Sequence, residues 1–203
     1  MHDTRLRRTP HLPRGPGYTP AHPCRLSHEV FPVTLTLILI RHAKSSWDDP
    51  FMDDHARVLN DRGRAAAPAI GAWLTAQGHV PDVVLCSDAA RTQETAALIR
   101  PHLTPTPALQ LVPALYHASP DTMLDLLRKQ TVRSVAMIGH NPGIAMLAEG
   151  MIKQRPAHPR FGDYPTCATC VITFDIAVWG NATRHSGNCT AFITPGDLPI
   201  FRA

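Results

Sequence analysis

Several features that would assign this 203-residue chain to another class of protein are scarce or missing. No apolar run approaches the ~20 residues that a membrane-spanning helix needs. Only three lysines occur, and residues 1–32 carry +3 of the formal charge of +4. Proteins that bind nucleic acid gather Lys and Arg over one folded face. The composition therefore argues against a membrane protein and against a nucleic-acid-binding surface, and the length fits one domain.

The cysteines do not indicate a disulfide framework. Their number, five, is odd, and no secretory signal precedes them, so we expect reduced thiols in a cytoplasmic protein. Cys167 and Cys170 have the spacing of a metal or redox motif, but they lie in a β-branched, strand-like run. Residues three apart on a strand face opposite sides. We therefore predict two core-filling thiols.

Residues 1–32 differ in composition from the rest of the chain. They hold six Pro, four His and five Arg with little apolar periodicity, which predicts a disordered arm. Prolines every few residues disfavour a transit peptide. In an alternative interpretation, Val33 is the true initiator and the arm is a start-site artefact. We expect residues 33–203 to form a single domain.

Strand-like and helical patterns alternate from residue 33 onward. Strands are predicted at 33–40, 82–87, 109–113, 134–140, 169–174 and 189–193, and helices at 61–77, 89–100, 121–129 and 143–152. For the first helix we expect Asn60 as N-cap, Gly78 as the stop and a kink or crowding at Pro68. Strands alternating with helices, followed by a strand pair, predict a three-layer α/β/α sandwich. Its sheet should be mostly parallel with an antiparallel edge.

Polar side chains directly follow three of the predicted strands. They are Arg41 and His42 after the first strand, Ser87 and Arg91 after the second, and His140 and Asn141 after the fourth. Ligands bind at the carboxyl ends of strands in open α/β sheets. We therefore predict that two arginines and two histidines converge on one pocket.

The residue types in this predicted pocket suit a phosphoryl group. Arg offers a planar fork of donors that matches phosphate oxygens. Asn141 as N-cap and Pro142 as the first helical residue would aim a helix N-terminus at the same place. A neutral His can attack phosphorus and carry the phosphoryl group. No carboxylates are spaced for two metals, so we expect a covalent route without metal or cofactor. Lys44 either adds positive potential at the rim or is simply solvated.

Three segments, LILIRHAKSSW, SDAARTQETA and MIGHNPG, resemble in that order the signature elements of the histidine phosphatase (phosphoglycerate mutase-like) superfamily. The short chain looks most like its SixA-type phosphohistidine phosphatases, with RHA in place of the usual RHG. The resemblance implies His42 as the phosphorylated nucleophile. It further implies that Arg41 and Arg91 bind phosphate, together with Ser45 and Asn141, and that His140 donates to the phosphoryl oxygens.

Two departures from the family pattern concern the proton donor and the rim. Asp48 stands where mutase-like members have Asn, and the segment LVPALYHASPD lacks the Glu that mutases use as general acid. Four residues are open as substitutes, namely Asp48, Asp53, Asp54 and His117. His55 and Arg57 either line the rim of the pocket or belong to a solvated loop.

The sequence thus predicts a metal-independent phosphatase that works through phospho-His42 on phosphohistidine of a signalling or phosphotransfer protein. A phosphatase of small phosphomonoesters is an alternative. A non-catalytic phosphate-binding module is another, because the mutase Glu is missing. The predicted partner is a phosphorylated protein or a small phosphate ester, with neither nucleic acid nor membrane involved.

Overall fold

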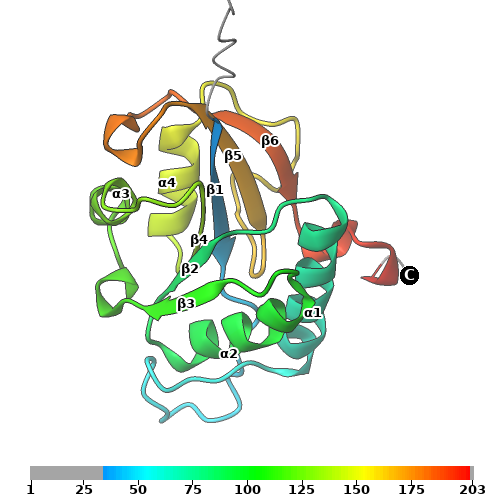
Figure 1. Ribbon diagram of the computed structural model, residues 1–203. Coiled ribbons are helices and arrows are strands. Elements are labelled where there is room, and N and C mark those ends of the chain that lie inside the picture. Colours follow the sequence, from blue (N-terminus) through cyan, green and yellow to red (C-terminus); the bar gives the residue numbers. More distant parts are fainter. Residues whose placement is uncertain (1–33, 202–203) are drawn as a thin grey trace, which may run out of the picture. The chain divides into compact units, whose positions relative to one another are not determined.

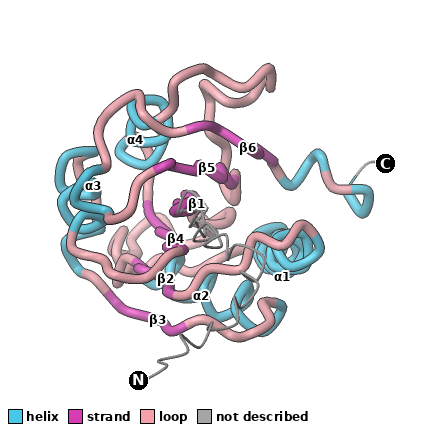
Figure 2. Tube along the Cα trace, turned by 45° about the horizontal axis from the view of Figure 1, so that its top comes forward, coloured by secondary structure: helices cyan, strands magenta, loops and turns pink. Residues whose placement is uncertain are grey.

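The computed structural model of the chain describes residues 34–201. The predicted arm lies outside these residues, so its disorder and the start-site alternative stay predictions. A six-stranded sheet with the order β3-β2-β4-β1-β5-β6 runs between two pairs of helices (Figures 1 and 2). In the part of the chain described, no helix is long and apolar enough to cross a membrane.

The predicted elements are present with small shifts at their ends. The strands are β1 (Thr34–Arg41), β2 (Val83–Cys86), β3 (Ala108–Leu111), β4 (Ser134–Gly139), β5 (Thr169–Asp175) and β6 (Asn188–Ile193). The helices are α1 (Asp61–Ala76), α2 (Ala90–Ile99), α3 (Pro120–Arg128) and α4 (Gly143–Met151). Strands β1 to β4 are parallel, whereas β5 and β6 pair antiparallel at one edge. The mostly parallel sheet with an antiparallel edge is confirmed.

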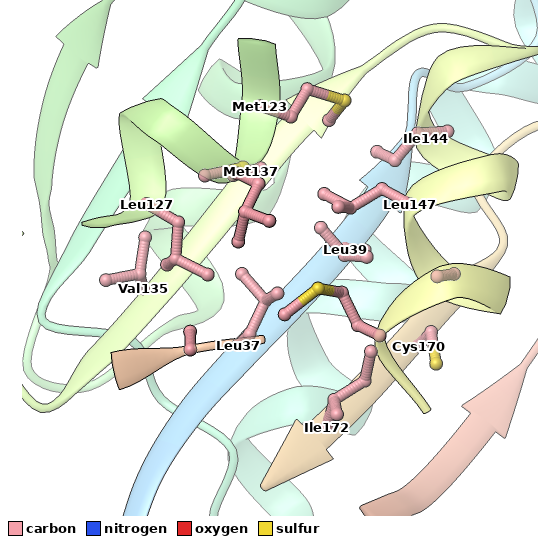
Figure 3. Packing of buried hydrophobic residues seen from close by; sticks show 14 of the residues in the cluster. Leu37, Leu39, Met123, Leu127, Val135, Met137, Ile144, Leu147, Cys170 and Ile172 are labelled. Atoms are coloured by element: carbon pink, nitrogen blue, oxygen red, sulfur yellow. The ribbon is translucent and has the colours of Figure 1, made fainter. Parts of the chain in front are cut away.

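Strand β1 lies in the middle of the core and is buried on both faces. Leu37 and Leu39 pack in the cluster that includes residues of α3 and α4 (Figure 3). Ile38 and Ile40 point the other way, into the cluster formed with α1 and α2. Burying one such side chain stabilises the fold by up to about 3 kcal/mol. The apolar strand thus joins the two outer layers, which confirms the α/β/α sandwich.

The start of α1 packs tightly against the chain segment that follows β1. The side chain of Asn60 accepts a hydrogen bond from the Gly63 amide at 3.0 Å, as expected of an N-cap. A Cβ added to Gly63 would lie 2.3 Å from the Lys44 carbonyl oxygen, so only glycine fits there. The helix continues through Pro68 as one element, and the expected kink or crowding there stays a prediction.

The two cysteines of the C-x-x-C spacing lie on opposite sides of the sheet, as predicted. Cys167 packs with the α1 and α2 layer, and Cys170 with the α3 and α4 layer. The thiol nearest to Cys170 in the described residues is instead Cys189 on the neighbouring strand, with the two Sγ atoms 3.7 Å apart. The spacing therefore does not form a shared metal or redox site.

Candidate active site

The ends of β1, β2 and β4 bring the predicted residues together. Strands β1 and β2 both pair with β4, and the ladder extends beyond the strands. The His42 amide donates to the Gly139 carbonyl at 3.0 Å, and the Ser87 amide donates to the Ile138 carbonyl at 3.1 Å. Since all three strands end at the same edge, the side chains that follow them meet.

His42 is buried and has a defined tautomer. Its Nδ1 lies 2.7 Å from the Ala43 carbonyl oxygen, which can only accept. Nδ1 therefore carries the proton, and Nε2 carries the lone pair. Burial, and then the positive charges of Arg91 and Arg41, lower the pKa of His42 to about 4 despite that hydrogen bond. At neutral pH the imidazole is thus uncharged and nucleophilic at Nε2.

His140 packs beside His42, with the ring centroids 5.2 Å apart. Its Nδ1 lies 3.1 Å from Nη2 of Arg91, and its Nε2 lies 2.9 Å from the Ser87 hydroxyl. A guanidinium only donates, so Nδ1 accepts and Nε2–H donates to Ser87. Burial, and then the charges of His42 and Arg91, lower the pKa of His140 to about 3. Both ring nitrogens have protein partners, so donation from His140 to a phosphoryl oxygen requires Nε2–H to leave Ser87.

Arg91 is buried in the first turn of α2 and points its guanidinium to the site. Its Nη1 donates to the Asp54 carbonyl oxygen, and Nη2 donates to Oδ2 of Asp54 at 2.9 Å. Two donors that suit a phosphate are therefore occupied by Asp54 of the β1–α1 loop, one by its backbone carbonyl and one by its carboxylate. An oxyanion that binds through Nη2 of Arg91 competes with that carboxylate.

Asp54 is the carboxylate that the structure places at this arginine. Oδ2 also accepts from the Tyr116 hydroxyl at 2.8 Å and lies 3.5 Å from Nε2 of His117. Burial alone would raise the pKa of Asp54, but the Tyr116 and Arg91 hydrogen bonds and nearby positive charge outweigh it and lower the pKa to about 2. Tyr116 and His117 belong to the segment that lacks the mutase Glu, so Asp54 brings a carboxylate there from another loop.

The other two candidate acids lie elsewhere in the same loop. Asp48 accepts from the Ser46 hydroxyl at 2.6 Å, and Asp53 accepts from the His55 amide at 2.7 Å. Neither contacts the two histidines or Arg91 through a hydrogen bond within residues 34–201. Of the four open substitutes, the structure brings only Asp54 and His117 to the site.

Arg41 is half-buried beside the site. Its Nη1 donates to the Tyr164 carbonyl oxygen at 3.0 Å, and its Nε is buried without a hydrogen-bond partner in the described part of the chain. Burial and the charge of Arg91 both lower the pKa of Arg41, which indicates that the two guanidinium groups are neighbours. Two neighbouring arginines, of which only Arg91 has a carboxylate partner among the described residues, favour a multiply charged anion.

Of two further predicted residues, Asn141 and Ser45, the first does not have its expected role as a helix cap, and phosphate binding by the second stays a prediction. Asn141 does not cap α4: its side-chain amide donates to the Tyr164 carbonyl at 3.2 Å, and Pro142 is the residue that precedes the helix. The prediction was wrong because the Asn side chain reaches a loop oxygen instead of the helix amides. Ser45 is buried and bridges Leu59 through its backbone, and no hydrogen bond of its side chain to the site is found in residues 34–201.

Of the two rim residues, Arg57 is buried, whereas the His55 side chain is 42% exposed. His55 lies 3.0 Å from an Asp88 carboxylate oxygen. Arg57 is 9% exposed, and its Cζ lies over the Trp47 ring, 3.5 Å from the ring centroid. Its Nε and Nη1 are buried without a partner among the described residues. The sequence shows Arg57 only as a charged residue in a loop, and no local pattern predicts its burial.

A search of residues 34–201 for three or more His, Cys, Asp or Glu side chains grouped as metal ligands finds none. The groups that meet at the strand ends are two neutral imidazoles, two arginines, a serine and the Asp54 carboxylate with its partners. This set can bind an oxyanion, attack it and supply a proton.

A family model of the histidine phosphatase superfamily (branch 1) matches residues 37–116. An uncharacterised chloroplastic protein of Arabidopsis thaliana is 30% identical over 136 residues, which cover 60% of this chain and 62% of that protein. The match thus spans less than two thirds of that relative. An uncharacterised protein of Mycobacterium leprae is 30% identical over 165 residues, which cover 77% of this chain and 99% of that one.

Solved structures agree with the family match. A candidate phosphohistidine phosphatase SixA of Agrobacterium tumefaciens is 27% identical with a TM-score of 0.65, covering 81% of this chain and all of the other. The protein histidine phosphatase SixA complexed with tungstate has the same fold, with a TM-score of 0.67 at 20% identity over 80% of this chain and 99% of the other. The chain belongs to the histidine phosphatase superfamily and has a SixA-type fold.

Proposed function

We propose that this protein is a phosphatase that forms a covalent phosphohistidine at His42 and acts on phosphohistidine carried by another protein. The observation that carries the proposal is the state of His42, a neutral imidazole with its Nε2 lone pair available beside two arginines. A solvent-exposed histidine at neutral pH would be partly protonated and free to choose either tautomer. In His42, burial disfavours the protonated form, and the Ala43 carbonyl keeps the proton on Nδ1.

In the first step, Nε2 of His42 attacks phosphorus and the bond to the leaving group breaks. The leaving group takes the bonding electrons and one proton, while Arg41 and Arg91 hold the charge on the phosphoryl oxygens. In the second step, water attacks the phosphorus of phospho-His42. The N–P bond then breaks, the electrons return to Nε2, and inorganic phosphate leaves.

We assign the proton supply to Asp54, with His117 beside it. In the free protein the pKa of Asp54 is about 2, so its carboxylate is ionised. A phosphoryl group that takes over Arg91 removes the positive partner from Asp54 and adds negative charge nearby. Both changes favour protonation of Asp54. The acid would thus become protonated as the substrate binds.

Two observations support a protein substrate. The loop that carries Asp54 also exposes Trp47 and Phe51, which are 68% and 95% exposed. Large exposed apolar side chains near a functional site are typical of contact with another protein. The protein with the same fold that was solved with tungstate is named a protein histidine phosphatase. We further propose that the protein is cytoplasmic and that residues 33–203 form a single domain.

The test compares three proteins on two substrates. Wild type, His42→Ala and the control His102→Ala, which removes an exposed histidine, are incubated with an aryl phosphate and with a phosphorylated histidine domain. We expect wild type and His102→Ala to act on both, and faster on the domain, while His42→Ala acts on neither. Turnover of the aryl phosphate alone would favour small phosphomonoesters. Failure of wild type on both would leave a phosphate-binding module.

A further inference from the structure

A cavity of about 900 Å³ lies next to the phosphoryl site and has no part in the steps above. Arg41 lines it, whereas His42, Arg91 and His140 do not. The remaining walls come from the first turns of α1, the loop before β5 and the segment after β6. Its volume is that of a small-molecule pocket, roughly 300 to 1,000 Å³. The cavity therefore has room for a part of the substrate beyond the phosphoryl group.

Positive charge predominates in the lining. Its cationic residues are Arg41, Lys44, Arg62 and Arg160, and its acidic residues are Asp61 and Asp163. Asp163 is paired with Arg160 at 2.9 Å, and Asp61 lies 3.7 Å from Arg64 outside the lining. Within residues 34–201, no salt bridge neutralises Lys44 or Arg62. The cavity is thus an electropositive hollow in which three cations, Arg41, Lys44 and Arg62, have no acidic partner in the described chain.

The wall that holds these cations is fixed by backbone contacts. The Asn60 amide donates to the Lys44 carbonyl oxygen at 2.9 Å, and Gly63 lets the helix approach that oxygen closely. Lys44 and Arg62 are therefore held at the same wall, each with only its side chain free to adjust. On another wall, the Thr194 hydroxyl donates to the Asp197 carboxylate at 2.7 Å. The backbone positions that carry these charges are thus fixed, and only the side chains adjust to a ligand.

Arg41 connects the cavity to the phosphoryl site. Arg41 directly precedes His42 in the chain, and its positive charge lowers the pKa of His42. Its side chain lines the cavity. Its buried Nε lacks a partner in the described residues, and a buried N–H without one is costly unless a ligand supplies it. A ligand group in the cavity would therefore lie beside a scissile phosphoryl group held by the same arginine.

We propose that this cavity binds a second oxyanion of the substrate, a carboxylate or phosphate on the same molecule as the scissile phosphoryl group. The proposal rests on the proposed function and specifies its substrate class. In a protein substrate, the second oxyanion is an Asp or Glu side chain next to the phosphohistidine. In a small substrate, it is a further acid group of the same molecule.

The test uses a matched ligand pair, phenyl phosphate and carboxyphenyl phosphate. Binding is measured by calorimetry in the His42→Ala background, where no turnover is needed, with and without Lys44→Ala or Arg62→Ala. We expect each substitution to weaken carboxyphenyl phosphate about 5- to 10-fold and phenyl phosphate less than about twofold, as loss of one hydrogen-bonded charge partner predicts. Lys129→Ala, an exposed lysine on α3's side of the sheet, should change neither.

Equal weakening of both ligands would overturn the proposal, because Lys44 or Arg62 would then serve the phosphoryl site. No weakening of either would overturn it as well. A second assay distinguishes the two sources of the oxyanion. It measures turnover of a phosphorylated histidine domain before and after the Asp and Glu residues next to its phosphohistidine are replaced by Asn and Gln. If replacing these acids lowers turnover by wild type but not by Lys44→Ala, the cavity binds an acidic protein segment. If turnover by wild type is unchanged, the cavity serves small substrates. Absence of turnover by wild type would contradict the proposed function only, since the binding comparison does not depend on it.

Discussion

Replacing Asp54 with Asn should have opposite effects on binding and on catalysis. The Asp54 carboxylate occupies one donor of Arg91 that a phosphoryl group needs, and the Asp54 backbone carbonyl occupies another. Asn keeps the size of the side chain and can still accept a hydrogen bond, but it carries no charge and cannot deliver a proton. The variant should therefore bind oxyanions more tightly and protonate leaving groups less well.

The gain in binding is limited by the exposure of the pair. The Arg91 side chain is 5% exposed, but that of Asp54 is 47% exposed, so solvent screens much of the attraction. Exposed ion pairs contribute about 0.2 to 1 kcal/mol. With the upper end of that range, Asp54→Asn should bind tungstate or inorganic phosphate about fivefold more tightly.

The loss in catalysis depends on the leaving group. A general acid contributes about 10²- to 10⁴-fold where the leaving group must be protonated. We expect kcat of Asp54→Asn to fall ~100-fold on phenyl phosphate. On p-nitrophenyl phosphate, whose leaving group departs as the anion, we expect a change of less than about threefold. Inhibition constants for inorganic phosphate are measured in the same assays.

The matched control is Asp53→Asn in the same loop. Asp53 accepts from the His55 amide and is exposed, so its replacement should leave both substrates and the inhibition constant unchanged. Equal losses of Asp54→Asn on the two aryl phosphates, or weaker binding of phosphate, would refute the assignment of Asp54 as the acid that Arg91 holds.

Three further outcomes are expected. The pKa values of His42 and His140, about 4 and about 3, lie below the ~6.5 of an unfolded chain. The unfolded state therefore binds more protons below pH 6.5. Urea unfolding should show a loss of roughly 2 kcal/mol per histidine from pH 7 to pH 5, and a pH-independent free energy of unfolding would contradict these shifts. Gly63→Ala should lower Tm, because its Cβ would lie 2.3 Å from a backbone oxygen. The expected loss in the free energy of unfolding is about 1 to 3 kcal/mol. Gly180→Ala, with nothing within 4 Å, should not. Activity should survive EDTA, and a loss that a divalent ion restores would contradict the metal-free mechanism.

The strand ends could be predicted because they depend on local pattern and one general rule. Apolar runs that stop at Arg41, Ser87 and His140 are visible in the sequence, and parallel strands end at a common edge. Two imidazoles and Arg91 were therefore placed correctly without any knowledge of the contacts between them.

The proton supply could not be predicted because it depends on contacts between distant segments. Asp54 and Tyr116 are 62 residues apart, and nothing in either loop indicates that they meet. In the sequence, three acids and one histidine are equally good candidates, and only the fold distinguishes them. The Asn141 cap failed for a related reason, since the competing acceptor at Tyr164 lies 23 residues away.

Mapping the phosphoenzyme tests the central claim most directly. Wild type is mixed with a phosphorylated histidine domain, quenched in alkali to preserve phosphohistidine, digested, and its peptides are analysed by mass spectrometry. We expect phosphate on the peptide that contains His42, at Nε2 by ³¹P NMR, and none in His42→Ala. Phosphate on another residue, or turnover without loss in His42→Ala, would contradict it.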